Sequence, residues 1–313
     1  MNTFTTKSVP RRLAVTIRPM DEELLGKVRE LVADPTRVPA LHALLQAQVA
    51  RVIEAMRDDS LAAGAPFSDE ELVRRVSAYE ELTEDLARAA ALIAYWGKTT
   101  DDRLVPGIVG RLANALDRGS GVNVWLELIL YPAVLVLYGA GLGAAIGQRE
   151  EQLALLLDSP TIRERGEWKR VALVLSGVAA LSHNAAKHLP GLERRHTPTS
   201  DHLCEVMRPW VDELEPDQES YERAFDRWEY LLGLAMFDLV RDAGHGGYAP
   251  VGRLSWRGNY GNGIEVALGQ EIAAAGANWP LLRAGLFGGD STRLAASVEG
   301  WHKYIAGARN QQF

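Results

Sequence analysis

The feature that most constrains the fold is an uncharged run of twenty residues, from Leu128 to Gly147. Twenty apolar residues in a helix are long enough to cross a membrane. Gly139, Gly143 and Gly147 recur every fourth residue, a spacing that lets two helices approach closely. The run is compatible with three different structures.

The first structure is a membrane span. Pro132 and the glycines weaken it, because both residue types disfavour an uninterrupted helix. Neither flank of the run carries the cluster of basic residues that orients a single span. The charge pattern therefore argues against membrane association through residues 128–147.

The second structure is a dinucleotide-binding fold. Val134–Tyr138 would be a strand, Gly139–Gly143 a turn, and Leu153–Asp158 a second strand with an acidic end. That arrangement would place a pyrophosphate on a helix N-terminus and a ribose hydroxyl on Asp158. The glycine spacing departs from G-x-G-x-x-G, and the helix between the strands would be short.

The third structure is a helix buried on all sides at the centre of a helical domain, with a break at Pro132. We favour it because amphipathic helices surround the run in sequence. Ser68 and Glu71 form a capping box before one of them. The predicted helices are Asp21–Asp34, Pro39–Met56, Ser68–Gly97, Asp101–Arg118, Trp168–Lys187, Asp201–Leu214, Ser220–Asp242, Ile264–Ala275 and Ser291–Ala308.

The predicted fold class is thus all-α, a multi-helix bundle around a buried glycine-rich apolar helix. Residues 1–19 form an N-terminal tail, in which the alternation of Leu13–Ile17 predicts one short strand. The segment His188–Ser200 is rich in proline and charge and predicts a boundary. It separates a helical bundle subdomain, residues 20–190, from a C-terminal helical subdomain, residues 201–313.

Charge and cysteine content narrow the function classes. The 34 basic and 41 acidic residues give a formal charge of −7, so we expect neither nucleic-acid nor membrane binding. Cys204 is the single cysteine, which fits a reducing compartment. The polar N-terminus has no apolar segment of the signal-peptide type, so the expected location is cytoplasmic.

One cluster of candidate ligand residues lies at the predicted boundary. His183, His188, His196 and His202 fall within twenty residues, but their spacing matches no metal site, so no metal is predicted. With Lys187, Arg194 and Arg195, the same segment forms a basic patch that would receive a phosphate or an acidic partner, and Arg194, Arg195 and His196 are its candidate residues. A solvated loop explains this patch equally well.

A second candidate is the loop that carries Arg253, Trp256 and Arg257. Two arginines beside an indole suit anion recognition and also suit ion pairs to the acidic helix that precedes them. We favour the ion pairs. Within that helix, Tyr221, Phe225 and Trp228 recur at helical spacing, which predicts a buried aromatic stripe.

No sequence motif assigns a catalytic activity or a cofactor to this chain. The glycine-rich turn Gly285–Asp290 precedes a helix but lacks the lysine of a phosphate-binding loop, and it is typical of a helix–helix connection. The chain contains neither G-x-S-x-G nor H-E-x-x-H. The catalytic residues stay unknown, and we predict no cofactor.

Three segments occur in a suggestive order: Tyr131–Ala145, Phe225–Arg257 and Leu281–Asp290. Together they resemble the helical regions that follow TIR-type or SIR2-type NAD-consuming modules in bacterial multidomain anti-phage defence proteins. The resemblance implies a helical part that senses a trigger or holds an assembly together. It assigns no family site to any residue of this chain.

The leading hypothesis is therefore a non-enzymatic helical sensor or scaffold module. Its partner would be a protein, either an effector domain or subunit or a second copy in a homo-oligomer. The alternatives are a nucleotide- or NAD-binding enzyme that uses Gly139–Gly143 or the Arg253 and Arg257 loop, and a membrane-associated protein.

Overall fold

The computed structural model describes residues 22–97, 103–116, 119–164, 167–257 and 263–310. This part of the chain is helical apart from one small hairpin, so the predicted all-α fold class is confirmed. The predicted tail, residues 1–19, and its strand Leu13–Ile17 lie outside the described residues.

The first helices begin and end close to their predicted bounds, because local capping signals define them. The Ser68 hydroxyl accepts a hydrogen bond from the Glu71 backbone N–H at 3.2 Å and starts α3. The predicted fourth helix is shorter than expected, since the Asn114 side chain donates to the Gly110 carbonyl at 2.6 Å and the helix ends there. The elements are α1 (Glu22–Val32), η1 (Pro35–Arg37), α2 (Val38–Met56), η2 (Asp59–Leu61), α3 (Asp69–Trp96) and α4 (Leu104–Ala113).

The apolar run forms α6 (Tyr131–Ile146), preceded by α5 (Asn123–Leu128). Pro132 lies in the first turn of α6, where its missing N–H breaks no hydrogen bond, so it starts the helix instead of breaking it. By length and composition the stretch Asn123–Ile146 could cross a membrane, but 94% of its most apolar window is buried inside the fold. The prediction of a buried core helix is confirmed.

Two glycines explain how α6 packs so closely on α3. A Cβ at Gly139 would lie 2.5 Å from the Ala87 carbonyl oxygen, and a Cβ at Gly143 would lie 2.1 Å from that of Ala91. Both distances are too short for a real Cβ atom, and both neighbours are backbone atoms of α3. The four-residue glycine spacing therefore serves a helix crossing.

The dinucleotide interpretation of the same run is wrong in its structural premise. Val134–Tyr138 is helical, and Leu153–Asp158 belongs to α7 (Glu150–Asp158). Gly141 faces the Trp228 ring, where a Cβ would lie 2.3 Å from the indole. The predicted turn is thus the middle of a packed helix.

The predicted helix Trp168–Lys187 is also wrong. Two strands, β1 (Pro160–Glu164) and β2 (Glu167–Arg170), pair in antiparallel orientation. Three four-residue helices follow, α8 (Val171–Val174), α9 (Gly177–Ala180) and α10 (His183–Ala186). Ser176 and Ser182 are the N-caps of the last two, and their non-helical backbone, with ψ of 161° and 153°, interrupts a continuous helix.

The helices predicted over Ser220–Asp242, Ile264–Ala275 and Ser291–Ala308 are present with closely similar bounds, whereas the helix predicted over Asp201–Leu214 runs from Pro198 to Trp210. Tyr221, Phe225 and Trp228 are all fully buried, which confirms the aromatic stripe as core. The predicted turn Gly285–Asp290 connects two helices, and Asp290 caps the second by accepting from the Thr292 backbone N–H at 2.7 Å. The elements are α11 (Pro198–Trp210), α12 (Gln218–Asp242), α13 (Leu254–Arg257), α14 (Ile264–Ala275), η3 (Gly276–Asn278), α15 (Pro280–Arg283), η4 (Leu286–Gly289) and α16 (Ser291–Asn310).

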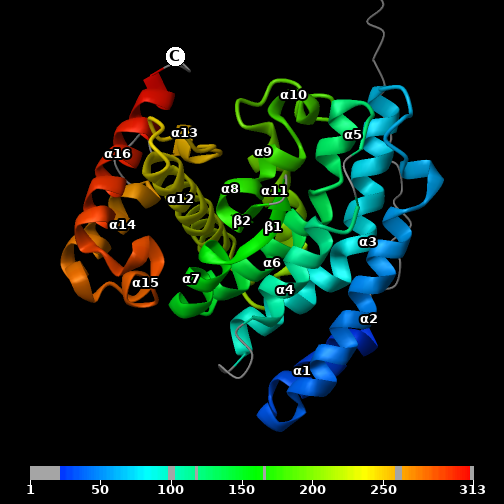
Figure 1. Ribbon diagram of the computed structural model, residues 1–313, viewed down its shortest axis with the longest axis horizontal. Helices are drawn as coiled ribbons and strands as arrows, with labels where there is room; N and C mark the ends of the chain where they lie inside the picture. Colours follow the sequence, from blue (N-terminus) through cyan, green and yellow to red (C-terminus); the bar gives the residue numbers. More distant parts are fainter. Residues whose placement is uncertain (1–21, 98–102, 117–118, 165–166, 258–262, 311–313) are drawn as a thin grey trace, which may run out of the picture.

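Figure 1 shows the arrangement of these helices. Helices α1, α2 and α3 lie on one side of the molecule, and α14 and α16 lie on the other. Between them, α6 contacts α3, α4, α11 and α12. The proposed boundary at His188–Ser200 stays a prediction; its last residues form the first turn of α11.

Candidate functional site

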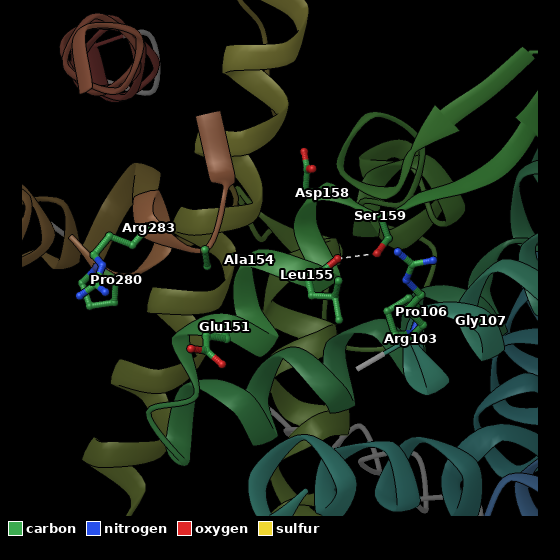
Figure 2. A pocket seen from close by; sticks show the side chains of 11 residues that line it. Arg103, Pro106, Gly107, Glu151, Ala154, Leu155, Asp158, Ser159, Pro280 and Arg283 are labelled. Atoms are coloured by element: carbon green, nitrogen blue, oxygen red, sulfur yellow. Dashed lines mark hydrogen bonds between the residues drawn. The ribbon is translucent and has the colours of Figure 1, made fainter. Parts of the chain in front are cut away.

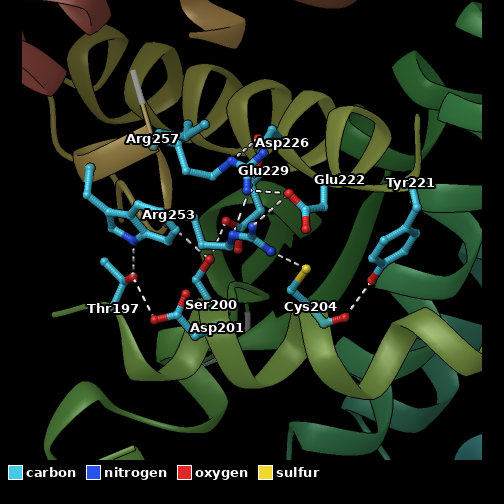
Figure 3. Close-up of polar contacts among 12 residues, drawn as sticks. Thr197, Ser200, Asp201, Cys204, Tyr221, Glu222, Asp226, Glu229, Arg253 and Arg257 are labelled. Carbon is cyan, nitrogen blue, oxygen red and sulfur yellow. Dashed lines mark hydrogen bonds and ion pairs between the residues drawn. The ribbon is translucent and has the colours of Figure 1, made fainter. Parts of the chain in front are cut away.

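The predicted arginines Arg253 and Arg257, with Trp256, lie where α11, α12 and the segment 249–257 meet (Figure 3). We call residues 249–257 the strap. Arg253 is only 6% exposed, so its guanidinium is enclosed by protein. Burial of a charged group at this depth requires partners of opposite charge.

Carboxylates of α12 supply those partners. Arg257 Nε lies 2.8 Å from Asp226, and its Nη1 contacts Glu222. Arg253 lies 3.6 Å from Glu222 and 4.0 Å from Asp226. Glu222 and Asp226 are four residues apart, so they share one face of the helix. The predicted ion pairs to the preceding acidic helix are thus present.

Cys204 of α11 lies under the same guanidinium. Arg253 Nη1 contacts the Cys204 sulfur, and the Tyr221 hydroxyl donates to the Cys204 carbonyl at 2.6 Å. Burial raises the pKa of the Cys204 thiol to about 12. The thiol is therefore protonated at neutral pH and is not a nucleophile in this state.

A third carboxylate of α12, Glu229, is bound in a different way. It accepts from the Ser200 hydroxyl at 2.5 Å and from the Tyr138 hydroxyl at 3.1 Å. The backbone N–H of Arg253 donates to the same Ser200 oxygen at 3.1 Å. Among the described residues, no guanidinium lies within ion-pair distance of Glu229.

Burial changes the proton affinity of both inner carboxylates. It raises the pKa of Glu229 to about 7, against the hydrogen bonds from Ser200 and Tyr138. It raises the pKa of Asp226 to about 6, against the charges of Arg257 and Arg253. Glu222 differs, because hydrogen bonds from Gln218 and Arg257 outweigh burial and lower its pKa. The cluster is therefore partly protonated near neutral pH.

A narrow crevice lies beside Glu229. Its volume of about 20 Å³ accommodates roughly one water molecule. His183 and Thr199 line it, with the His183 Nδ1 3.2 Å from the Thr199 hydroxyl. Burial and Lys187 lower the pKa of His183 below its usual value, so this ring stays neutral to a lower pH than an exposed histidine. The crevice is too small for an organic substrate.

The remaining predicted residues lie at the edge of this cluster. Arg194, Arg195 and His196 are exposed, and Arg195 lies 4.0 Å from the exposed Glu205. The next residue, Thr197, is buried and accepts from the Trp256 indole N–H at 3.0 Å. The fold thus joins the two candidate loops through Thr197, but it leaves Arg194–His196 in solvent.

A groove that the sequence did not predict lies between α4, α7 and α15 (Figure 2). Its volume is about 840 Å³. Arg103 and Arg283 flank it from opposite sides, with Ala154 and Leu155 between them. Both arginines are exposed, and neither forms an ion pair with a residue in the described ranges. Glu151 and Asp158 of α7 also line the groove, so it carries charges of both signs.

The four clustered histidines do not converge. His188 pairs with Asp69 at 2.9 Å, and His202 lies 2.7 Å from Glu80. In the described part of the chain, no group of three or more His, Cys, Asp or Glu side chains is placed to hold a metal ion.

Sequence analysis missed Glu222, Asp226 and Glu229. Their signal was present, because the three acids recur at helical spacing beside the buried aromatic stripe. Acids next to a core-facing stripe must lie close to the core and require partners. No comparable signal marks Arg103 and Arg283, which are far apart in sequence.

Comparison with known proteins gives no relative. No protein-family model, no curated protein and no solved structure matches this chain.

Proposed function

We propose that the chain is a cytosolic helical sensor or scaffold module that has no catalytic activity of its own and controls an effector protein. The observation that carries this proposal is the internal pairing of Arg253 and Arg257 with Glu222 and Asp226. Arginines occupied by the chain's own carboxylates have few donors left for a nucleotide phosphate. The loop therefore acts as part of the fold.

The groove in Figure 2 supplies the contact surface in this proposal. It is concave, and Ala154 and Leu155 line it together with the flanking arginines and with two acidic residues of α7, Glu151 and Asp158. Arginine beside apolar surface is typical of residues that dominate protein interfaces. An effector segment with an acidic residue next to apolar ones would complement it.

The resemblance to helical regions of anti-phage proteins indicates which class of effector protein the chain would control. In those proteins the helical region follows an NAD-consuming module. We therefore propose a partner of that class, supplied by another domain or chain, and a role in phage defence.

The test is co-expression with the product of a neighbouring gene, followed by measurement of the dissociation constant. We expect Arg283→Glu to weaken binding by about tenfold or more, because it reverses a charge in the groove. Lys303→Glu is the matched control, since Lys303 lies exposed on α16 and pairs with Glu299. If the two substitutions changed the dissociation constant equally, the groove would not be the binding surface for the effector.

A second measurement tests the enzymatic alternative. In a thermal-shift screen with NAD, ATP and cyclic nucleotides, we expect no stabilisation of the purified chain. Turnover of any of these compounds by the chain alone, lost in Arg253→Ala, would overturn the proposal.

A further inference from the structure

The charges in the Arg253 cluster do not balance. Glu222, Asp226 and Glu229 of α12 meet only two guanidiniums, those of Arg253 and Arg257, among the described residues. Asp201 of α11 adds a fourth carboxylate; it is 7% exposed and accepts from Thr197. Enclosed carboxylates without cations hold protons more readily than exposed ones.

The geometry identifies Glu229 as the α12 carboxylate that has no guanidinium partner in the described part of the chain. Arg253 and Arg257 are within 4.0 Å of Glu222 and Asp226. The hydrogen-bond donors to Glu229 within the described ranges are the hydroxyls of Ser200 and Tyr138, and neither carries a charge. The titratable and charged groups that face Glu229 come from all elements around it: Tyr138 (α6), His183 (α10), Asp201 and Cys204 (α11), Glu222 and Asp226 (α12), and Arg253 and Arg257 (strap).

The strap covers this carboxylate directly. A Cβ at Gly252 would lie 2.6 Å from Glu229 Oε2 and 2.9 Å from the Ser200 hydroxyl oxygen. Gly252 has φ +55°, a conformation that favours glycine. The backbone therefore approaches Glu229 more closely than any residue with a side chain would allow, and water is kept from this side of the carboxylate.

We infer that the strap is a pH-dependent latch, closed over Glu229 when this carboxyl group is protonated and loosened when it ionises. An ionised carboxylate needs water or a cation, and the crevice beside it holds only about one water. Lifting of the strap admits solvent. The pH-dependent latch adds to the proposed function a signal to which the module responds. It involves only groups of this chain, so it can be tested, and can fail, independently of any partner protein.

The direction of the response follows from proton linkage. Enclosure of Glu229 in the folded chain raises its pKa from 4.5 to about 7, because burial outweighs the hydrogen bonds from Ser200 and Tyr138 and the charge of Arg253. The closed strap thus binds the proton more tightly than the open strap, and closure is lost as pH rises towards and through 7. The shift corresponds to a change of at most about 300-fold in the closed-to-open ratio.

Cys204 gives a clean measurement of opening, because it is the single cysteine and Arg253 of the strap covers its sulfur. The rate of thiol labelling is measured from pH 5.5 to 8 and divided by the rate of the urea-unfolded chain at the same pH. We expect this ratio to rise severalfold with a midpoint near pH 7 in the wild type.

The substitution Glu229→Gln keeps the shape of the side chain and removes its titration. We expect the labelling ratio of this variant to stay low above pH 6.5. Glu219→Gln is the control, since Glu219 is exposed on the same helix, and it should behave as the wild type. A flat wild-type ratio, or a rise retained in Glu229→Gln, would overturn the inference.

A second measurement covers the case in which Glu229→Gln does not fold. Amide hydrogen exchange of the strap in the wild-type chain, corrected for the intrinsic pH dependence of exchange, should accelerate between pH 6 and 8. Peptides from α3 should show no such change. Unchanged protection of the strap over this range would refute the latch.

Discussion

Arg75 shows how much a single enclosed residue contributes. It is 2% exposed, and its guanidinium donates to the carbonyls of Leu61 and Ala62 at 2.9 Å each. It also contacts Glu71 at 2.6 Å and lies 4.4 Å from the centroid of the Trp125 ring. The Arg75 side chain thus connects the segment between α2 and α3 with helix α3 and with the core.

We expect Arg75→Met to lower the free energy of unfolding by about 2–4 kcal/mol, because the Leu61 and Ala62 carbonyls lose the donor that Arg75 supplies. Glu71 loses its bond to Arg75 and keeps those from Arg74. Urea denaturation with an unchanged m-value measures this loss. In Arg57→Met, which removes a 56% exposed side chain paired with Glu54, the change should stay within about 0.5 kcal/mol. Equal urea midpoints for Arg75→Met and the wild type would contradict the assignment.

The sequence predicted the candidate site only in part, because some of its contacts join residues from different helices. Acidic residues on the helix before Arg253 and Arg257 made their ion pairs predictable. The role of Glu229 was not, because its partners Ser200 and Tyr138 come from two other helices. Helical periodicity identifies the face of a residue but not the side chain that meets it.

At the scale of elements, prediction succeeded where the signals were local. Caps and apolar periodicity defined α2, α3, α12, α14 and α16. It failed over residues 168–187, where β2 and three four-residue helices replace one predicted helix. Helices this short are not stable by themselves, so tertiary contacts determine them, and a single sequence does not display those contacts.

The crossing of α3 and α6 gives a prediction for whole elements. Gly143→Ala places a Cβ 2.1 Å from the Ala91 carbonyl oxygen, a backbone atom that can move only with its helix. We expect a loss of about 1–3 kcal/mol in the free energy of unfolding, because the two helices must separate. Chemical denaturation measures it.

The matched control is Gly26→Ala on α1, where an added Cβ meets no atom within 4 Å. Alanine has the higher helix propensity, so this variant should be more stable than the wild type by about 0.5–1 kcal/mol. If both alanine variants gained stability, the close crossing would not be what requires glycine at 143.

At the scale of the molecule, the buried apolar residues form one continuous core from Leu24 to Ile305. Helix α6 lies within it and contacts helices from both predicted subdomains, among them α3 and α12. Carboxyl groups near this core are therefore coupled to unfolding of the chain as a whole. The pH dependence of stability should show their combined effect.

Two groups of carboxyls act in opposite directions. The raised pKa values of Glu229, about 7, and Asp226, about 6, mean that the folded chain holds protons that the unfolded chain releases. The free energy of unfolding therefore falls as pH rises from about 5 to 7. Hydrogen bonds from Arg74 and Arg75 lower the pKa of Glu71 to about 2, so its contribution is lost as pH falls from 4.5 towards 2.

Stability should accordingly be greatest near pH 4.5–5, as measured by urea unfolding at constant ionic strength. Glu229→Gln should flatten the decline on the neutral side and leave the acid side unchanged. Glu71→Gln should do the reverse, because the amide keeps no charge for Arg75 to stabilise. If the wild-type chain instead gained stability from pH 6 to 7.5, the enclosed carboxylates would be ionised in the folded state without a loss of stability. The negative charge of Glu229 would then be balanced by a group other than Arg253 and Arg257.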